Sequence, residues 1–348
     1  MKAAGIRHGQ CRAFISKENH DMTTSPDAST AVLLLNLGGP ECLDDVEPFL
    51  YNLFSDRQII KLGPPFLQKF IARRIARKRA PSSRTNYARI GGGSPILNIT
   101  RKQALALEDS LHPHGDYLVR PCMRYWPPRA AEVLAELADN NIERIIALPL
   151  YPHYSIATTG SSLSDLKETL KKRNPQPRLQ VIRSWPDQPD YIKCLANRII
   201  ERVHQTGEDT VVVYSAHSLP RDFIDNGDPY VTELNKTIAA VEQKTGIQGQ
   251  LCYQSRSGPV RWLEPSTPDM LQHLAAQGTK KILMVPISFV SDHIETLYEI
   301  DMLYRDMAVE LGMELRSTPG LNDDPEFIDG LRQLVLSCGP DQKINSAG

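Results

Sequence analysis

Residues 210–220 read TVVVYSAHSLP, a run that stays apolar instead of alternating with polar residues until it reaches His217. Three further runs of this kind are AVLLLNL (31–37), RIIALPL (144–150) and KILMVPI (281–287). Such runs are typical of parallel strands buried on both faces of a sheet. Segments with helical spacing lie between them, and one of these runs from Ala130 to a stop signal at Asn140 and Asn141. The alternation predicts an α/β fold with parallel sheets.

The chain also contains a weak internal repeat. AVLLLNLGGP (31–40) resembles the 210–220 stretch, and the segment from Cys122 to Pro149 resembles the one from Cys252 to Pro286, each expected to run as loop, helix, strand and proline. We therefore predict two similar Rossmann-like halves with an active-site cleft between them, because ligands of open parallel sheets bind beyond the carboxyl ends of the strands. The predicted units are a flexible tail over 1–30, halves over 31–185 and 208–338, and a second tail over 339–348.

Bulk composition excludes several classes of protein. The chain has 348 residues, 41% of them hydrophobic, a net charge of -1 and a pI near 6.8, so it has no electrostatic footprint for nucleic acid. Its six cysteines form no C-x-x-C pair, which argues against a disulfide framework, a zinc site or an iron–sulfur cluster and indicates a reducing cytoplasm. No stretch approaches the roughly 18 apolar residues of a membrane span. The first residues are polar and unpatterned, so Met22 is as good a candidate start as Met1.

His217 directly follows a buried run, at the end of the strand where parallel sheets carry function. A histidine at this place is either a functional side chain or a structural one whose nitrogens are hydrogen-bonded. The Ser-Ala-His motif alone leaves both interpretations open.

The segment FVSDHIETLYEID (289–301) carries a second group of polar side chains. Asp292 and Glu295 have the spacing of a helix N-cap and its N3 partner, so a capping box would explain both carboxylates. Glu295 and Glu299, however, lie on one helical face with no Lys or Arg at i+3 or i+4 to relieve their repulsion. Together with His217 and His293 they form a set of N and O ligands that suits a divalent transition metal.

Two further segments have open interpretations. ARIGGGSPI (88–96) lacks both phosphate-loop spacings, so it is a weak nucleotide signal and either lines a pocket for a flat ligand, through Ser94 and its backbone, or forms a plain turn. Residues 61–84 hold eight basic residues and no acid, with Phe66, Phe70 and Ile71 among them. This segment is either an ordinary packed helix with a basic face or an amphipathic lip that meets an anionic membrane surface or an acidic ligand.

Together these motifs resemble the ferrochelatase family from about Val32 to about Leu336. The residues that carry the resemblance are LNLGGP (35–40), YARIGGGSPI (87–96), YPHYSIATTGSSL (151–163), SAHSLP (215–220), NGDPY (226–230), CYQSRSGP with Trp262 (252–262) and FVSDHIETLYEID (289–301). Seven motifs in the family's order form a highly specific signature. The resemblance implies a chelatase-like fold of two α/β halves and an enzyme of haem biosynthesis that inserts ferrous iron into a porphyrin.

By resemblance, His217 and Glu295 are the iron-binding pair, and Asp292, His293 and Glu299 form a supporting acidic path. The positions matched to the porphyrin propionates are Arg79, Tyr87 and Ser255, and those matched to other parts of the pocket are Leu37, Arg124, Tyr125, Tyr151, Ser155 and Trp262. The basic segment 61–84 matches the mouth of the pocket, which in the family can face a membrane. The expected location is the cytoplasm, with peripheral contact to the inner face of the membrane.

Three departures from the family pattern refine these expectations. Members with a [2Fe-2S] cluster have a cysteine at the position of Ile156 and three more near the C-terminus, where this chain has Cys338 alone, so no cluster and no permanently bound cofactor are expected. Leu303 stands where some relatives extend the row of acids. Leu37 stands where relatives that metallate coproporphyrin tend to have Tyr, which favours protoporphyrin IX.

Three alternatives to this function remain at the level of sequence. The first is a coproporphyrin III ferrochelatase. The second is a chelatase for another metal such as cobalt, because N and O ligands alone do not select iron. The third is a non-catalytic porphyrin carrier. The residues do not divide the roles of metal ligand and proton acceptor between His217 and Glu295.

Overall fold

The computed structural model describes residues 30–140, 142–173, 176–256 and 258–339. The predicted N-terminal tail lies outside this part of the chain except for Thr30, which begins the first strand. Of the predicted C-terminal tail only residue 339 is described. Met22 also lies outside the described residues.

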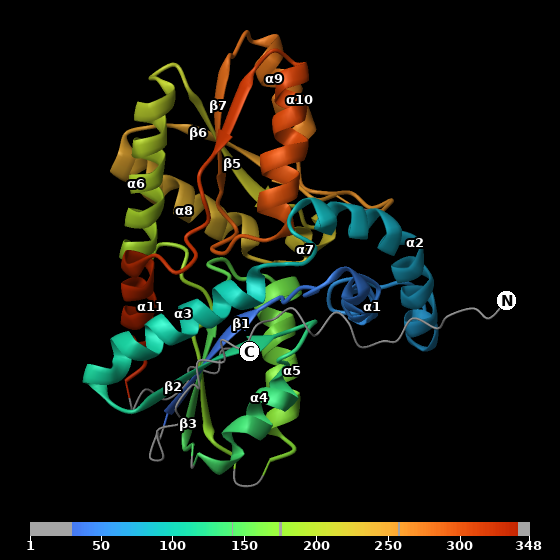
Figure 1. Cartoon of the computed structure of the whole chain (residues 1–348), viewed down its shortest axis with the longest axis vertical. Helices are drawn as coiled ribbons and strands as arrows, with labels where there is room; N and C mark the ends of the chain where they lie inside the picture. Colours follow the sequence, from blue (N-terminus) through green and yellow to red (C-terminus); the bar gives the residue numbers. More distant parts are fainter. Residues whose placement is uncertain (1–29, 141, 174–175, 257, 340–348) are drawn as a thin grey trace, which may run out of the picture.

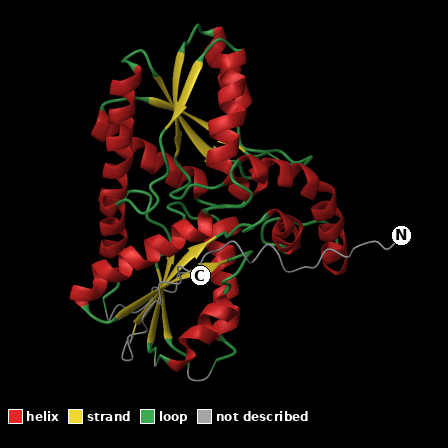
Figure 2. Ribbon diagram, viewed as in Figure 1, coloured by secondary structure: helices red, strands yellow, loops and turns green. Residues whose placement is uncertain are grey.

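The strands form two separate sheets (Figure 2). Both sheets are parallel and have the same strand order. The first has the order β2-β1-β3-β4 and contains β1 (Thr30–Asn36), β2 (Tyr117–Met123), β3 (Arg144–Pro149) and β4 (Arg178–Val181). The second has the order β6-β5-β7-β8 and contains β5 (Val211–His217), β6 (Gly249–Gln254), β7 (Lys281–Pro286) and β8 (Glu314–Ser317). This arrangement confirms the predicted α/β fold with two similar halves.

Helices connect successive strands in both halves. In the first half they are α1 (Val46–Ser55), α2 (Gln68–Arg89), α3 (Ile96–Leu111), α4 (Ala130–Glu136), the π-helix η6 (Ile156–Gly160), α5 (Ser161–Leu170) and α6 (Pro189–Thr206). In the second half they are α7 (Arg221–Asp225), α8 (Tyr230–Thr245), α9 (Thr267–Ala276), the π-helix η7 (Glu295–Tyr304), α10 (Arg305–Glu310) and α11 (Pro325–Ser337). Short 3-10 turns are η2 (Leu43–Asp45), η3 (Pro65–Leu67), η4 (His112–His114) and η5 (Leu137–Asp139).

Alternate side chains of each central strand enter different cores, as the strand period requires. In β1, Val32 and Leu34 join a core that also contains Val212 and Tyr214 of β5. Leu33 of β1 faces a separate core formed with α4 and α5. One face of each sheet therefore contributes to a core that both halves share.

Two helices cross between the halves (Figure 1). The helix α6 follows the last strand of the first sheet but packs against α8 of the second half, and the C-terminal helix α11 packs against both α6 and α3. Arg144 of β3 donates to the Cys338 carbonyl at 3.2 Å just beyond α11. The boundaries 31–185 and 208–338 stay a prediction, and these contacts show that the two halves pack as neighbours.

The structure corrects one part of the predicted repeat. Cys122 and Cys252 lie in strands β2 and β6, and not in loops. Both strands are at sheet edges, and polar residues such as Arg120 and Gln250 interrupt their apolar pattern.

Within the part of the chain that the structure describes, every helix is too short or too polar to cross a membrane.

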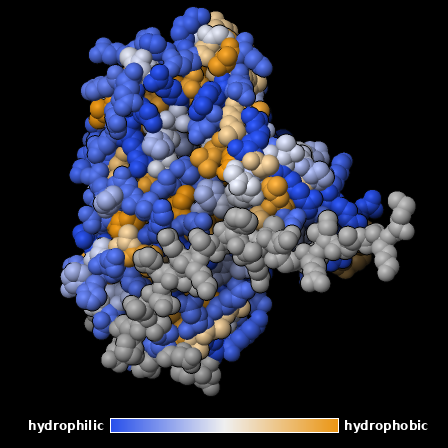
Figure 3. All heavy atoms as spheres, viewed as in Figure 1, coloured by the Kyte–Doolittle hydropathy of each residue, from blue (hydrophilic) through white to orange (hydrophobic). Residues whose placement is uncertain are grey.

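Most of the basic segment 61–84 lies in the long helix α2, and Phe66 lies in the turn η3 before it; α2 projects together with α1 from the side of the molecule (Figure 1). Phe66 is 82% exposed and Phe70 is 60% exposed, whereas Ala72 and Ala76 are buried against α1. Hydrophobic residues on the face drawn in Figure 3 occur in small groups among hydrophilic ones. The two exposed phenylalanines therefore stand out from an ordinary packed helix.

Candidate active site

His217 is the last residue of β5, at the level of Gln254 on the neighbouring strand β6. Its backbone is fixed on both sides: the His217 N–H donates to Ser288 Oγ at 3.0 Å, and the Tyr230 hydroxyl donates to the His217 carbonyl at 3.1 Å. The imidazole is left partly open, with 38% of the side chain exposed. A side chain held this way is positioned by the sheet without being packed into the core.

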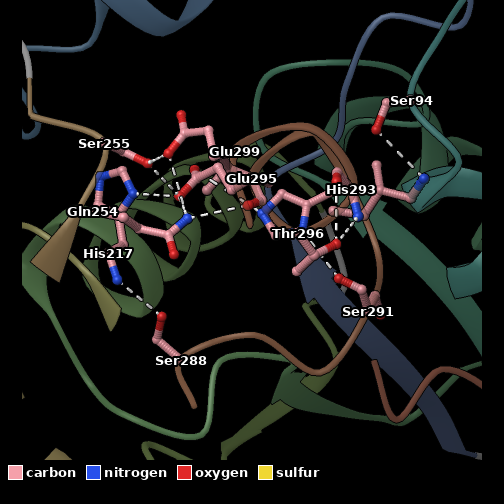
Figure 4. A network of polar contacts seen from close by, with 12 residues as sticks. Ser94, His217, Gln254, Ser255, Ser288, Ser291, His293, Glu295, Thr296 and Glu299 are labelled. Carbon is pink, nitrogen blue, oxygen red and sulfur yellow. Dashed lines mark hydrogen bonds and ion pairs between the residues drawn. The ribbon is translucent and has the colours of Figure 1, made fainter. Parts of the chain in front are cut away.

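Glu295 is the direct partner of this histidine. His217 Nδ1 lies 2.8 Å from Glu295 Oε2, and the Glu295 side chain is 15% exposed (Figure 4). Burial opposes the charge of Glu295, but the charge and hydrogen bond of His217 outweigh it and hold the pKa of Glu295 well below its ordinary value. Burial likewise lowers the pKa of His217, and the adjacent Glu295 carboxylate reverses this and raises it. The pair therefore favours an anionic carboxylate beside a basic imidazole.

Glu299 brings a second carboxylate to the same place through Ser255. The Ser255 hydroxyl lies 2.6 Å from Glu299 Oε2 and 2.9 Å from Glu295 Oε2. Burial, together with the charge of Glu295, raises the pKa of Glu299 to about 7. Ser255 has a φ of 66°, a left-handed conformation that is uncommon outside glycine. It turns the chain so that consecutive side chains, which would point to opposite faces of a regular strand, both reach the two acids.

The capping-box interpretation of Asp292 and Glu295 is not what the structure shows. The helix that starts at Glu295 has Ile294 as its N-cap and no side-chain cap. The Asp292 N–H donates instead to Asn322 Oδ1 at 2.9 Å, and Asn322 returns a hydrogen bond of 2.7 Å to the Asp292 carboxylate. Asp292 therefore joins the loop after β7 to the segment after β8 that contains Asn322. The Glu295 side chain faces His217 instead.

His293 lies on the other side of Glu295. Its Nε2 is 3.9 Å from Glu295 Oε1, its Nδ1 is 3.0 Å from the Ser291 carbonyl, and Phe289 packs edge-on at 4.4 Å. Burial lowers the pKa of His293, so the imidazole is neutral near pH 7. With one nitrogen on a carbonyl, the neutral ring keeps its other nitrogen as an acceptor directed at the Glu295 side.

Three of the predicted pocket residues of the first half, Leu37, Arg79 and Tyr87, lie in or against the core formed by α1 and α2. Tyr87 of α2 is buried, and burial, together with the Glu295 charge, raises the pKa of its hydroxyl. The guanidinium of Arg79 lies 5.5 Å from the centre of the Phe54 ring, and its charge offsets a small part of the rise in the pKa of Glu299. Leu37, which directly follows β1, packs in the same α1 and α2 core as Tyr87.

Arg124 and Tyr125 are engaged by an acid that the sequence did not single out. Arg124 Nη2 and the Tyr125 hydroxyl both lie 2.8 Å from Asp56 Oδ2, and Arg124 Nε donates to Ser161 Oγ at 2.7 Å. Asp56 follows helix α1 and is remote from both in sequence, so no motif marks it. The Arg124 charge is therefore already balanced inside the protein.

The remaining predicted pocket residues are not brought to the histidine–carboxylate pair by any direct hydrogen bond among the described side chains. Ser155 donates to Asp228 Oδ2 at 2.9 Å and caps η6, while Tyr151 is buried. Trp262 is half-buried in the loop after β6. The porphyrin-binding roles of these residues stay a prediction.

The glycine-rich loop links α2 to α3 as a tight turn. Its Ser94 N–H donates to the Pro40 carbonyl at 2.7 Å, and a side chain at Gly93 would collide with the backbone of Glu41. Glycine is therefore required here by close packing. A separate role for Ser94 in lining a pocket stays a prediction.

The two four-stranded parallel sheets of identical order form an α/β fold of the kind found in chelatases. SirB from Bacillus subtilis with Fe3+ superposes with a TM-score of 0.50 at 12% identity, covering 68% of this chain and 89% of that one. The sirohydrochlorin chelatase SirB from Bacillus subtilis subspecies spizizenii, in complex with cobalt, gives a TM-score of 0.51 at 10% identity over 89% of this chain and 94% of that one. At these identities the likeness shows the fold alone.

Sequence comparison identifies the family within this class. The ferrochelatase family model matches residues 29–338. The ferrochelatase of Desulfotalea psychrophila (strain LSv54 / DSM 12343) is 59% identical over 88% of this chain and 96% of the relative. That of Geotalea uraniireducens (strain Rf4) is 52% identical over 88% and 97%. The chain therefore belongs to the ferrochelatase family, lyases that insert iron into porphyrin, which confirms the resemblance and the prediction of an enzyme.

Proposed function

We propose that this protein inserts Fe(II) into protoporphyrin IX to form protohaem. The observation that carries the proposal is the 2.8 Å pair of His217 Nδ1 and Glu295 Oε2 at the end of β5, with Glu299 beside it. An imidazole nitrogen and a carboxylate oxygen bind a divalent transition metal less tightly than thiolates do, so the ion can be passed on to the porphyrin. Among the described residues no three His, Cys, Asp or Glu side chains are grouped to hold a metal ion, so His217 and Glu295 offer two donors.

The reaction requires three things of the protein: a distorted ring, removal of two pyrrole protons and delivery of a partly dehydrated ion. The lowered pKa of Glu295 keeps an anionic oxygen available to the ion. The Glu295 carboxylate raises the pKa of His217 and so makes its neutral form a stronger base, and it is this neutral imidazole that can accept a pyrrole proton. Glu299, whose pKa is about 7, can take up a proton near neutral pH through the Ser255 hydrogen bond. His217 and Glu299 are thus the two proposed acceptors for the pyrrole protons, and hydrogen bonds through Glu295 and Ser255 connect them.

Anaerobic initial-rate measurements of Fe(II) insertion into protoporphyrin IX and coproporphyrin III test the substrate. We expect the higher kcat/KM with protoporphyrin, because Leu37 is apolar where coproporphyrin-using relatives tend to have Tyr. Preference for coproporphyrin would replace the proposed substrate. A higher rate with Co(II) or Zn(II) than with Fe(II) would indicate another chelatase, and porphyrin binding without turnover would indicate a carrier.

We also propose that the protein holds no [2Fe-2S] cluster. Ile156 is 44% exposed and apolar, and its side chain cannot bind iron. Purified protein should contain no inorganic sulfide. Stoichiometric sulfide would overturn this proposal.

The exposed end of α2 is proposed to contact an anionic membrane surface. Phe70 shares a hollow of about 480 Å³ with Arg73, Arg74, Arg77 and Lys78. Exposed aromatic rings beside several cations are the combination by which amphipathic helices bind anionic lipid.

A further inference from the structure

Gln254 is a buried polar residue that lies in the motif CYQSRSGP but was assigned no role from the sequence. It is 1% exposed and ends β6 beside His217. Ser215 donates to its Oε1 at 2.5 Å. Its Nε2 then lies 3.2 Å from the Glu295 carbonyl, 3.5 Å from Glu295 Oε2 and 3.4 Å from Glu299 Oε2 (Figure 4). The amide orientation follows from chemistry, since the opposite one would direct an oxygen at two carboxylates.

The first sheet shows that the fold does not need this polar pair. Leu35 pairs with Cys122 and Pro149, as Ser215 pairs with Cys252 and Pro286, so Leu35 and Ser215 are equivalent positions. Leu35 is 1% exposed and apolar, whereas Ser215 is a fully buried hydroxyl. Burying a polar pair is unfavourable unless it is hydrogen-bonded. Because the first sheet packs an aliphatic side chain at this position, the polar pair of Ser215 and Gln254 is not required by the fold, and the adjacent site explains its presence.

By the same equivalence Gln254 corresponds to Arg124, two residues after Cys252 and Cys122 respectively. Arg124 forms an ion pair of 2.8 Å with Asp56, so its carboxylate partner is neutralised by a permanent cation. Gln254 instead reaches Glu295 and Glu299 with a neutral N–H. A neutral donor fixes the direction of a carboxylate and leaves its charge available to a metal ion, which an arginine would not.

We propose that Gln254, oriented by Ser215, is a positioning residue that aligns the Glu295 carboxylate for the metal ion, with Glu299 beside it, and adds no positive charge to the site. The inference rests on the proposed function. Partners of this kind, one step removed from the metal, typically change metal affinity or activity by about 10- to 100-fold when they are replaced.

Gln254→Leu and Gln254→Lys test the proposal, with Gln180→Leu as the matched control. Gln180 belongs to β4 of the other sheet and is also buried, at 4% exposed. Its side-chain amide donates to the Gly339 carbonyl beyond α11. Initial rates of Zn(II) insertion are measured with metal and porphyrin varied separately. Gln254→Leu should raise the KM for Zn(II) by about tenfold and leave the KM for porphyrin within about twofold. Gln254→Lys should weaken metal binding further, because its cation competes with the ion.

Co(II) binding to the substrate-free protein, followed by visible absorption, provides a readout that does not depend on turnover. Wild-type protein without insertase activity would refute the proposed function, and the Co(II) titration would still report on Gln254. We expect weaker Co(II) binding and an altered spectrum in Gln254→Leu, with wild-type behaviour in Gln180→Leu. A Gln254→Leu protein that matches the control in both Zn(II) KM and Co(II) affinity would overturn the proposal, as would tighter Co(II) binding by Gln254→Lys than by Gln254→Leu.

Discussion

His217 and Glu295 are 78 residues apart in the chain and are joined by a contact of 2.8 Å between Nδ1 and Oε2. The histidine belongs to the end of β5 and the glutamate to the first turn of η7, which follows the neighbouring strand β7. The parallel pairing of these two strands therefore brings the pair together. Substitutions in the pair should affect chemistry more than folding, because neither side chain belongs to an apolar core.

His217→Ala should leave the fold intact and abolish metal insertion. The imidazole is 38% exposed and its backbone contacts remain in the variant, so the free energy of unfolding should change by no more than about 1 kcal/mol. Loss of a metal ligand and proton acceptor should lower kcat by roughly a hundredfold or more. Denaturant unfolding and initial-rate kinetics check both parts. Near-normal turnover would return this histidine to a structural role.

Glu299→Gln should become more stable relative to wild type as the pH rises. The pKa of Glu299 is raised in the folded protein from 4.5 to about 7, so the folded state binds the proton more tightly than the unfolded chain. Below pH 4.5 the carboxyl is protonated in both states and its titration has no effect on stability. Between pH 4.5 and about 7 the unfolded chain has lost this proton while the folded state keeps it, so the free energy of unfolding of the wild type falls over that interval and levels off above it. Urea unfolding at pH 5, 6, 7 and 8 measures the difference.

The control is Glu310→Gln, which removes an exposed carboxylate from the following helix α10. The stability gap between Glu299→Gln and wild type should widen from pH 5 to about 7 and then level off, and that of the control should not show this trend. A constant gap for Glu299→Gln would mean that Glu299 titrates normally.

The strands that could be predicted are those with neighbours on both sides. β1, β3, β5 and β7 are central in their sheets, and their continuous apolar runs follow from burial on both faces. The edge strands were harder, since β2 contains the buried Arg120, whose charge is balanced by Glu108 and Glu136. Such a strand satisfies its polar groups through tertiary contacts that no periodicity reveals.

The sequence predicted those site residues whose own type and spacing indicate their chemistry. It did not predict the contacts between side chains that are distant in sequence. The acids of 289–301 and His217 stand out by type and spacing, together with the family resemblance. Gln254 reaches Glu295 across 41 residues, and Arg124 reaches Asp56 across 68. These contacts depend on strand register and on the π-helical geometry of η7, which a pattern of residue types does not encode.

Phe66→Ser combined with Phe70→Ser should weaken binding to anionic vesicles. The two rings are 82% and 60% exposed beside the cations of α2, so their removal costs little folding energy and deletes the apolar part of the contact. Co-sedimentation with vesicles of phosphatidylglycerol and phosphatidylcholine measures it. Val309→Ser, which removes a 65% exposed side chain from α10, is the control. Unchanged sedimentation of the double variant would leave α2 as an ordinary surface helix.

Glu295→Gln should separate catalysis from stability. The amide keeps the shape of the side chain and can still accept the hydrogen bond from Ser255. Loss of the attraction to His217 is offset by relief of the repulsion with Glu299, so the free energy of unfolding should stay within about 1 kcal/mol of wild type.

Metal insertion by Glu295→Gln should fall by roughly a hundredfold or more, because an amide neither accepts a pyrrole proton nor supplies an anionic oxygen to the ion. Porphyrin binding should persist, since the predicted propionate contact Arg79 lies on α2 and is unaffected by the substitution. Fluorescence titration with porphyrin and single-turnover Fe(II) insertion measure the two steps separately. A variant that binds porphyrin and metallates it at the wild-type rate would remove Glu295 from the mechanism and transfer its role to Glu299 or His293, the two side chains that flank it.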